Sequence, residues 1–314
     1  MPSHSSSPLT DVSVVIPAYN YARYLPEAIT SVLAQTFTAL ELIVVDDGST
    51  DETTEICARY TDPRFRYVRQ ENAGLSAARN SGIQHARHSY VAFLDADDRW
   101  DPGFLEAVID QFTRLGPEFA AVAAACSRMD GDGKLLAPPR QNFLLQGELT
   151  AAIFCLRNRP LSSSVVVRRS VFDECGGFDP SLRSSEDRDM WIRITARGHR
   201  FFYLAAPLAA IRRHPQNMSK NAPRMKRNSG LVLHRAWQTA AVPRWNFPFW
   251  LRAASIHYFL VAWTHFDDGL RGRAWRYLLT STILWPVFIH PHRVAEPPLF
   301  RLRAVAHFLS RGGS

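Results

Sequence analysis

Cysteine is scarce in this chain of 314 residues, and the few cysteines are far apart. They are Cys57, Cys126, Cys155 and Cys175. Structural zinc sites and disulfide frameworks show cysteines at close, regular spacings. The absence of close pairs argues against a zinc site, and it favours reduced thiols in a cytosolic setting.

Long apolar runs and a secretory signal are also missing. Residues 1–10 are polar, lack the basic and apolar regions of a signal peptide, and are expected to be disordered. A spanning helix needs roughly 18 to 20 uninterrupted apolar residues. The nearest candidate, residues 253–263, contains His257 and is followed by a segment with two aspartates. We therefore expect no transmembrane helix.

Acidic residues are too few to balance the basic ones, and the formal net charge is +8. The acids concentrate in the first 110 residues, whereas the basic excess follows residue 155. This charge indicates a partner of opposite sign, which is nucleic acid, an anionic lipid surface or a phosphorylated substrate. The arginines are scattered and match no nucleic-acid-binding motif, so nucleic-acid binding is not expected.

The first half of the chain alternates strand-like and helix-like segments. Compact apolar runs predict buried strands at 12–17, 40–47, 64–68 and 90–95. Helical spacing over 24–34 and 74–87 predicts helices, and residues 49–52 form a capping box that would open a helix to about Tyr60. Apolar strands separated by helices predict an α/β fold, with a mostly parallel sheet covered on both faces.

The pattern loosens after residue 116. We expect further strands at 119–126, 162–169, 201–205 and 208–213. A helix is expected over 186–197, and from about residue 225 the chain is expected to be helical, aromatic and basic.

Polar residues follow three of the predicted strands, at 17–20, 46–49 and 95–98. Ligands of parallel sheets bind beyond the carboxyl ends of the strands, so these residues predict one binding crevice. Asp95, Asp97 and Asp98 repel one another, and a metal ion, a nearby arginine or water must relieve that repulsion.

Five stretches together resemble the family 2 glycosyltransferases, which have a GT-A-type fold. In chain order they are VSVVIPAYNYARYLPEAITSVLAQT, ELIVVDDGSTDET, NAGLSAARNSGI, YVAFLDADD and SSEDRDMWIRI. The resemblance implies a Rossmann-like sheet flanked by helices over residues 11–222, with a helical extension over 223–314. It also implies an inverting enzyme of bacterial type that transfers a hexose-like sugar from a nucleotide-diphosphate donor.

The acidic turn is the metal site that the resemblance implies. Asp95-Ala96-Asp97 is similar to the family's DXD motif, so Asp97 and Asp95 would bind Mn²⁺ or Mg²⁺, and Asp95 and Ala96 would adjoin the donor. Carboxylate oxygens suit these hard cations, which neutralise a diphosphate. His214 resembles a position where some relatives have a histidine near the metal, with a structural or exposed histidine as the alternative. A helix cap is the alternative for the acidic turn, above all for Asp98.

The nucleotide is expected at the first two strand ends. The residues that would wrap the base and ribose through their main chain are Pro17, Ala18, Tyr19 and Asn20. Asp47 would accept a hydrogen bond from a base N–H, with helix capping as the alternative. Arg79 would approach the base or the diphosphate, with a surface salt bridge as the alternative.

Glu186 and Asp187 match the family's ED motif, which implies a catalytic base. Asp187 would take the proton, and Glu186 would orient it or hold the acceptor. The alternative is that both acids only favour the start of a helix. Trp191 is assigned to the acceptor side, where it would stack on a sugar, with core packing as the alternative. For Arg212 and Arg213, phosphate contact and solvation both stay open.

The processive synthases of the family carry a Gln-x-x-Arg-Trp motif, which is missing after Trp191. Transfer of a single sugar to a glycan or a lipid-linked acceptor is therefore favoured. Two other functions stay open. A sugar-1-phosphate nucleotidyltransferase would need a Gly-rich basic loop after the first strand, where this chain has Pro-Ala-Tyr-Asn. The other is a catalytically inactive membrane-surface binding protein.

The aromatic and basic residues of 223–314 predict peripheral attachment to the inner face of the cytoplasmic membrane. A helical cap or a homodimer surface is the alternative for this region.

Overall fold

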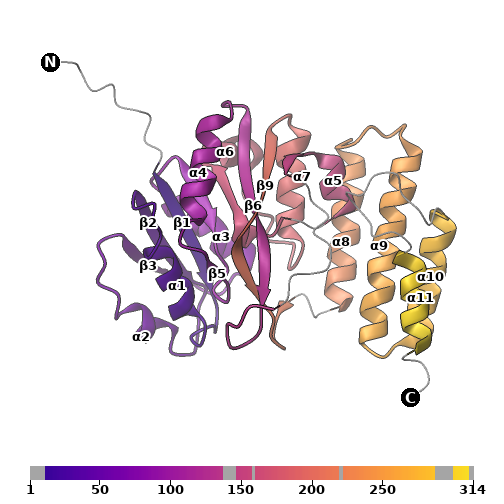
Figure 1. Cartoon of the computed structure of the whole chain (residues 1–314), viewed down its shortest axis with the longest axis horizontal. Coiled ribbons are helices and arrows are strands. Elements are labelled where there is room, and N and C mark those ends of the chain that lie inside the picture. Colours follow the sequence, from indigo (N-terminus) through magenta and orange to yellow (C-terminus); the bar gives the residue numbers. More distant parts are fainter. Residues whose placement is uncertain (1–10, 137–145, 158–159, 219–221, 287–299, 311–314) are drawn as a thin grey trace.

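The structure is a computed structural model of the chain, and it describes residues 11–136, 146–157, 160–218, 222–286 and 300–310. Residues 1–10, which are predicted to be disordered, lie outside the described residues. An α/β part with a central sheet occupies the N-terminal two-thirds of the chain, and four helices stand beside it (Figure 1).

The first four strands are parallel and alternate with helices. The strands are β1 (Val12–Ala18), β2 (Leu40–Asp46), β3 (Phe65–Arg69) and β4 (Tyr90–Phe93). The helices between them are α1 (Leu25–Leu33), α2 (Thr53–Cys57) and α3 (Leu75–His85). Every residue of β1, β2 and β4 is buried. The expectation that uninterrupted apolar runs become central strands, covered on both faces, is confirmed.

The remaining strands extend the sheet on the β4 side. They are β5 (Arg99–Trp100), β6 (Phe119–Met129), β7 (Gly147–Leu149), β8 (Val165–Arg168) and β9 (Arg200–Arg212). The sheet order is β3-β2-β1-β4-β8-β6-β9-β5, and β7 pairs with β9. Because β8 is antiparallel to both β4 and β6, the strands β1 to β4, β6 and β9 all run the same way. The prediction of a mostly parallel sheet flanked by helices is confirmed.

Four further helices accompany these strands. They are α4 (Phe104–Arg114), α5 (Ala151–Leu156), α6 (Ser170–Cys175) and α7 (Glu186–Ala196). The residues of β1 point alternately to the two faces of the sheet. Val15 belongs to the core on one face, whereas Val14 and Ile16 belong to the core on the other. A methyl group on Gly82 of α3 would lie 2.2 Å from Val15 Cγ1, so this glycine lets α3 approach the sheet closely.

The capping box predicted at residues 49–52 is wrong. Helix α2 begins only at Thr53, and its N-cap residue, Glu52, makes no side-chain cap hydrogen bond. The Ser49 hydroxyl instead accepts from the Asn20 main-chain N–H at 3.0 Å, and the Asp51 carboxylate accepts from the Ala22 N–H at 2.9 Å. Ser49 therefore joins the ends of β1 and β2, whereas Asp51 joins them and also accepts from the Thr53 N–H at 3.1 Å at the helix start.

Two strand predictions in the second half also differ from the structure. Residues 162–164 form a 3-10 turn before β8, and the Ser164 hydroxyl donates to the Leu161 carbonyl within it. The strands expected at 201–205 and 208–213 are one strand, β9. Its pairing with β6 shifts register around Pro207, where no N–H is available for the ladder, and then continues.

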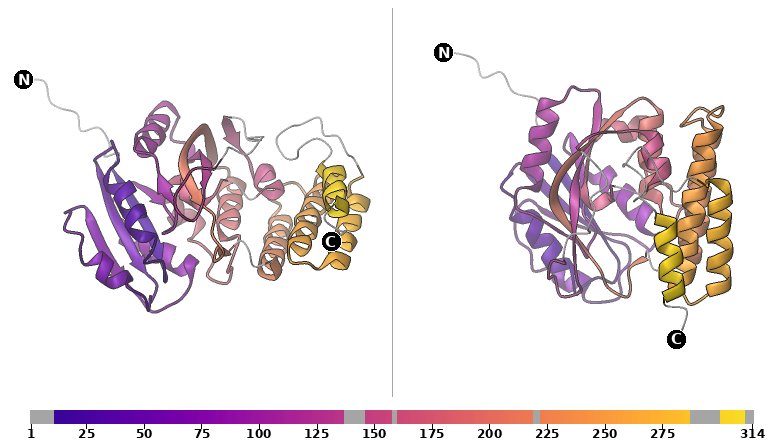
Figure 2. Two further views of the ribbon diagram at one scale, coloured as in Figure 1. Left: turned by 60° about the horizontal axis from the view of Figure 1, so that its bottom comes forward. Right: turned by 45° about the vertical axis from the view of Figure 1, so that its right-hand side comes forward.

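The last four helices form a bundle against the α/β part, as both views of Figure 2 show. They are α8 (Ala222–Gln238), α9 (Phe247–Asp267), α10 (Arg271–Leu284) and α11 (Phe300–Ser310). The Arg188 guanidinium of α7 donates to the Ser229 hydroxyl of α8 at 2.8 Å, which ties the bundle to the α/β part. Within the described ranges, no helix is long and apolar enough to cross a membrane.

Candidate active site

A cavity of about 500 Å³ lies at the carboxyl ends of β1, β2 and β4. Parallel strands end at the same edge of a sheet, so the polar residues that follow them meet there. The predicted site residues that line the cavity are Pro17, Ala18, Tyr19, Asp47, Arg79, Asp95, Ala96, Asp97, Glu186 and Asp187. The first turn of α7 thus faces the acidic turn across the cavity.

The acidic turn directs its three carboxylates to three different partners. Asp95 accepts from the Arg79 guanidinium at 2.6 Å. Asp97 lies 2.9 Å from His214 Nε2. Asp98 accepts from the Ser163 hydroxyl at 2.6 Å, and it also accepts a main-chain N–H from β9. Protein groups therefore relieve the crowding, and Asp98 connects the turn before β8 to the end of β9.

Asp97 and His214 form a partial cation site. Burial, followed by the charge of Asp95, raises the pKa of Asp97. His214 is itself buried, and its Nδ1 has no hydrogen-bond partner among the described residues. Asn217 donates to Asp97 Oδ2 at 3.2 Å. An additional positive charge beside these groups would therefore be favoured.

A complete protein cage for a metal is not seen. No group of three or more His, Cys, Asp or Glu side chains could hold a metal ion in the part of the chain that the structure describes. Asp95 faces Arg79 and does not converge with Asp97 and His214. Mg²⁺ is usually bound by one or two carboxylates together with substrate phosphates, so Asp97 and His214 fit a metal that a bound nucleotide would help to hold.

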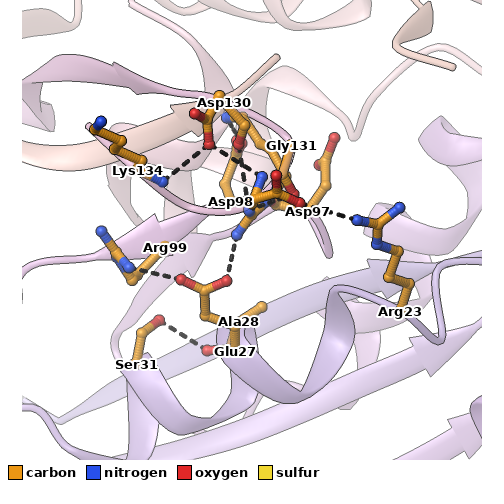
Figure 3. Close-up of polar contacts among 12 residues, drawn as sticks. Arg23, Glu27, Ala28, Ser31, Asp97, Asp98, Arg99, Asp130, Gly131 and Lys134 are labelled. Carbon is orange, nitrogen blue, oxygen red and sulfur yellow. Dashed lines mark hydrogen bonds and ion pairs between the residues drawn. The ribbon is translucent and has the colours of Figure 1, made fainter. Parts of the chain in front are cut away.

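Arg212 lies buried below the acidic turn. Its Nε donates to the Asp97 carbonyl at 2.8 Å, and its guanidinium also bonds Glu27 of α1. Glu27 accepts a second ion pair from Arg99 at 2.6 Å, and Figure 3 shows these two residues beside the turn. Arg212 thus supports the main chain of the turn. Both arginines line the cavity, but Arg213, unlike Arg212, is exposed.

Arg79 joins the two sides of the cavity. Its Nη2 donates to Asp95 and its Nη1 to Glu186, both at 2.6 Å. The arginine is 1% exposed and its guanidinium lies over the Phe178 ring, so this is no surface salt bridge. Burial lowers the pKa of Arg79, but the charges of Asp95 and Glu186 raise it by a larger amount. The pKa is therefore above its ordinary value, and the side chain stays charged. Arg79 therefore sets the separation of the two acids.

The ED pair occupies the first turn of α7. Ser185, directly before it, has a left-handed φ of 61°, which is uncommon for a residue other than glycine. Asp187 accepts from the Arg188 main-chain N–H at 2.7 Å. Burial, then the charge of Glu186, raises the pKa of Asp187 to about 7. A carboxylate with this pKa can exchange a proton near neutral pH.

Asp47 orders the loop that enters α3. Its carboxylate accepts from the main-chain N–H groups of Ala73 at 2.9 Å and Gly74 at 2.7 Å. Gly74 has a φ of 94°, which a residue with a side chain rarely adopts. Asp47 therefore fixes a loop beside the cavity and does not cap α2, the helix that follows it.

Three predicted site residues lie outside the cavity lining. His214 contacts Asp97 at 2.9 Å but does not itself line the cavity. Asn20 has a φ of 56° and accepts from the Thr50 N–H at 2.8 Å, so it joins two loops. Trp191 is fully buried, and its Nε1 donates to the Pro160 carbonyl at 3.2 Å. The acceptor-side position of Trp191 is thus corrected to a core position, because its ring packs between Phe178 and Phe201.

Several lining residues were not predicted from the sequence. They are Asn72, Gly74, Ser162, Arg183, Asn217, Arg224 and Met225, among others. The stretch NAGLSAARNSGI contains the first two, and Asn217 follows His214 by three residues. Arg224 and Met225 carry no local sign, because they belong to the α8 helix beyond the motifs.

Curated proteins with similar sequences match the α/β part. Chondroitin synthase of Escherichia coli is 32% identical over 190 residues, which are 60% of this chain and 27% of that protein. The uncharacterized glycosyltransferase RP339 of Rickettsia prowazekii is 35% identical over 191 residues, 60% of this chain and 59% of that protein. The chain thus spans between about a quarter and three-fifths of the length of these relatives.

Solved structures share the fold over most of the chain. Mannosyltransferase PcManGT from Pyrobaculum calidifontis, in complex with GDP-Man and Mn²⁺, has a TM-score of 0.63 and 19% identity, covering 98% of this chain and 83% of that one. S. aureus TarS 1–349 in complex with UDP-GlcNAc has a TM-score of 0.58 and 18% identity, covering 89% and 93%. At these identities the likeness concerns the fold, which is of the GT-A type.

The family model that describes glycosyl transferase family 2 matches residues 13–176. This stretch is more than half of the 314 residues, and it contains four of the five stretches that carry the resemblance. The chain therefore belongs to glycosyl transferase family 2.

Proposed function

We propose that the chain is an inverting, metal-dependent glycosyltransferase that moves one sugar from a nucleotide-diphosphate donor to a hydroxyl of a glycan or lipid-linked acceptor. One observation carries the proposal. A carboxylate with a pKa of about 7, Asp187, faces an acidic turn across one cavity. A general base opposite a cation site suits sugar transfer, and a protein that only binds has no need of it.

The nucleotide is proposed to lie against the ends of β1 and β2. Pro17, Ala18 and Tyr19 line this side of the cavity, and Asp47 holds the loop that closes it. Both terminal nitrogens of Arg79 already bond carboxylates. We therefore assign Arg79 to positioning Asp95 and Glu186, while its charge favours a diphosphate nearby.

Asp97 and His214 are the residues that would hold Mn²⁺ or Mg²⁺, with Asp95 two residues before Asp97 on the same turn. When bound, the ion would neutralise the diphosphate, which makes the nucleotide a better leaving group. The protein residues then need to orient the donor so that its anomeric carbon faces α7. Positioning and charge neutralisation account for most of the acceleration in a displacement of this kind.

The transfer step uses Asp187 as the base. The carboxylate takes the proton of the acceptor hydroxyl while the hydroxyl oxygen bonds the anomeric carbon. The bond from that carbon to the diphosphate oxygen breaks on the opposite face, so the configuration is inverted. The products are the glycosylated acceptor, a nucleoside diphosphate and a protonated Asp187. Glu186, held by Arg79, would orient Asp187 or the acceptor.

A donor screen tests the function. The purified chain is incubated with Mn²⁺ and a set of UDP-, GDP- and dTDP-sugars, and nucleoside diphosphate release by slow hydrolysis is measured. One donor is expected to give release that EDTA abolishes and that Asp97→Asn reduces. In a separate incubation with a nucleoside triphosphate and a sugar 1-phosphate, release of pyrophosphate would instead indicate a nucleotidyltransferase. Failure to bind any nucleotide sugar would indicate an inactive binding protein. A cytoplasmic location stays a prediction.

A further inference from the structure

Helix α10 has an exposed apolar stripe, which we call the α10 face. It consists of Trp275, Leu279 and Ile283, which are 36%, 61% and 70% exposed. Their spacing of four residues places them along one side of the helix. The opposite side of α10 packs against the other helices of the bundle, where Ala274 and Leu278 are buried. The helix is therefore apolar both toward the bundle and toward the solvent.

Arginines flank the α10 face. Arg271, Arg273 and Arg276 are all exposed, and at 100° per residue Arg271 and Arg276 lie on opposite sides of the stripe. Residues 269–314 contain seven arginines, one glutamate and neither lysine nor aspartate. This excess of six positive charges is most of the net charge of +8. The nearest acidic residues in the sequence are Asp267, the last residue of α9, and Asp268, which follows it.

The side of α10 opposite the α10 face contacts α8. Arg224 and Met225 in the first turns of α8 line the cavity. The next residue, Lys226, lies 4.2 Å from the centre of the Tyr277 ring of α10 and bonds its hydroxyl. Figure 1 shows α9 between α8 and α10 in this bundle. Tyr277 lies about 160° around the helix from Leu279, the centre of the α10 face, so the α10 face points away from this contact and toward the solvent.

We infer that the α10 face binds an anionic lipid surface. Its apolar side chains would enter the boundary between headgroups and acyl chains, and the arginines would contact lipid phosphates. Charge complementarity favours this occupant over a second copy of the chain. In a two-fold symmetric contact the same surface meets itself, so two surfaces with the same excess of positive charge would be brought together. The inference goes beyond sugar transfer and does not depend on it.

The test is flotation of the full chain with vesicles of phosphatidylcholine, with and without phosphatidylglycerol. We expect binding to the anionic vesicles that high salt reduces. The triple variant Arg271→Gln, Arg273→Gln, Arg276→Gln is expected to weaken partitioning by about fivefold per arginine, on the order of 10² in total. The matched control is Arg59→Gln, Arg87→Gln, Arg114→Gln, which removes the same charge from exposed positions of the α/β part. It should bind nearly as well as the parent chain.

The apolar part is tested separately with Leu279→Gln and Ile283→Gln, at positions whose exposure leaves folding undisturbed. These variants should bind anionic vesicles at least several-fold more weakly. The inference is overturned if the chain stays unbound at low salt, if the control loses as much binding as the α10 variant, or if the α10 variants abolish a dimer seen by light scattering. Donor hydrolysis without vesicles should be unchanged in all of them, so failure here is separate from failure of the proposed function.

Discussion

Asp187 differs from the other acids of the cavity in its partner. Asp95 and Glu186 bond the Arg79 guanidinium, and Asp97 bonds His214, whereas Asp187 bonds the main-chain N–H of the next residue. Without a cation in direct contact, burial dominates and the pKa of Asp187 rises to about 7. The contrast separates a candidate base from acids that are bonded to other side chains.

The rate of transfer should therefore increase with pH through about 7. Asp187 accepts a proton only as a carboxylate, and below its pKa of about 7 most of it is already protonated. We expect kcat/KM to fall on the acid side of this value and to level off above it. Asp187→Asn should lower the rate by about 10² to 10⁴ and remove the acid limb. The affinity for nucleoside diphosphate with Mn²⁺, measured by calorimetry, should change by a few-fold at most. If kcat/KM of Asp187→Asn still falls on the acid side of about pH 7, the proton acceptor is another group.

Arg79 is expected to stabilise the fold as well as the site. Arg79→Gln leaves Asp95 and Glu186 without their shared cation, and breaking a buried ion pair costs about 3–5 kcal/mol of unfolding free energy. Urea denaturation measures this loss. The control, Arg114→Gln, breaks an exposed pair with Asp110 and should cost less than about 1 kcal/mol. Equal losses in the two variants would contradict the bridging role of Arg79.

At the scale of elements, the acidic turn is held by strands that follow it in the sequence. Asp98 accepts from Ser163, in the 3-10 turn before β8, and from the Arg212 N–H at the end of β9. The Ser163 hydroxyl also accepts from the Asp95 N–H at 3.1 Å. The 3-10 turn before β8 therefore positions both the metal-side acids and the sheet.

Removal of the Ser163 hydroxyl should loosen this arrangement. In Ser163→Ala a buried oxygen of Asp98 loses its donor, and we expect a loss of about 1–3 kcal/mol in the free energy of unfolding. Ser162→Ala is a matched control from the same turn, because the Ser162 hydroxyl is buried with no hydrogen-bond partner among the described residues. Its stability in urea should be close to that of the parent chain. The assignment fails if Ser162→Ala costs as much as Ser163→Ala.

At the scale of the whole molecule, the helical region and the α/β part share the cavity. The first turns of α8 line it, and Arg188 of α7 bonds both α5 and α8, at the Phe154 carbonyl and the Ser229 hydroxyl. The domain boundary predicted at residue 222 stays a prediction. Ligands that bind this cavity should stabilise the bundle together with the sheet.

The midpoint of thermal unfolding, Tm, should show that the metal and the nucleotide bind cooperatively. Asp97 and His214 form only part of a cation site, so Mn²⁺ and nucleoside diphosphate together should raise Tm more than the two separate shifts combined. At a ligand concentration of 100 Kd the stabilisation is about 2.7 kcal/mol, a shift on the order of 5 °C. EDTA should remove the metal-dependent part, and Asp97→Asn should lack it while keeping the nucleotide part. A full shift with Mn²⁺ alone would contradict a nucleotide-completed site.

The sequence by itself determined the strands β1 to β4 with the helices between them, the residues that end the strands, and the start of α7. These are local properties, because an apolar run or a helical period is contained within a few neighbouring residues. Parallel pairing then brings the strand ends to one edge, so Asp47, Asp95 and Asp97 could be assigned to one site before any contact was known.

Only the tertiary structure decided which group meets which acid. Arg79 and Glu186 are 107 residues apart, and Asp97 and His214 are 117 residues apart. The insertion of β8 between β4 and β6 and the burial of Trp191 also depend on contacts between residues that are far apart in the sequence. Such pairings depend on how the sheet order and the helices place distant segments in space, and the local periodicity of the sequence does not encode that placement.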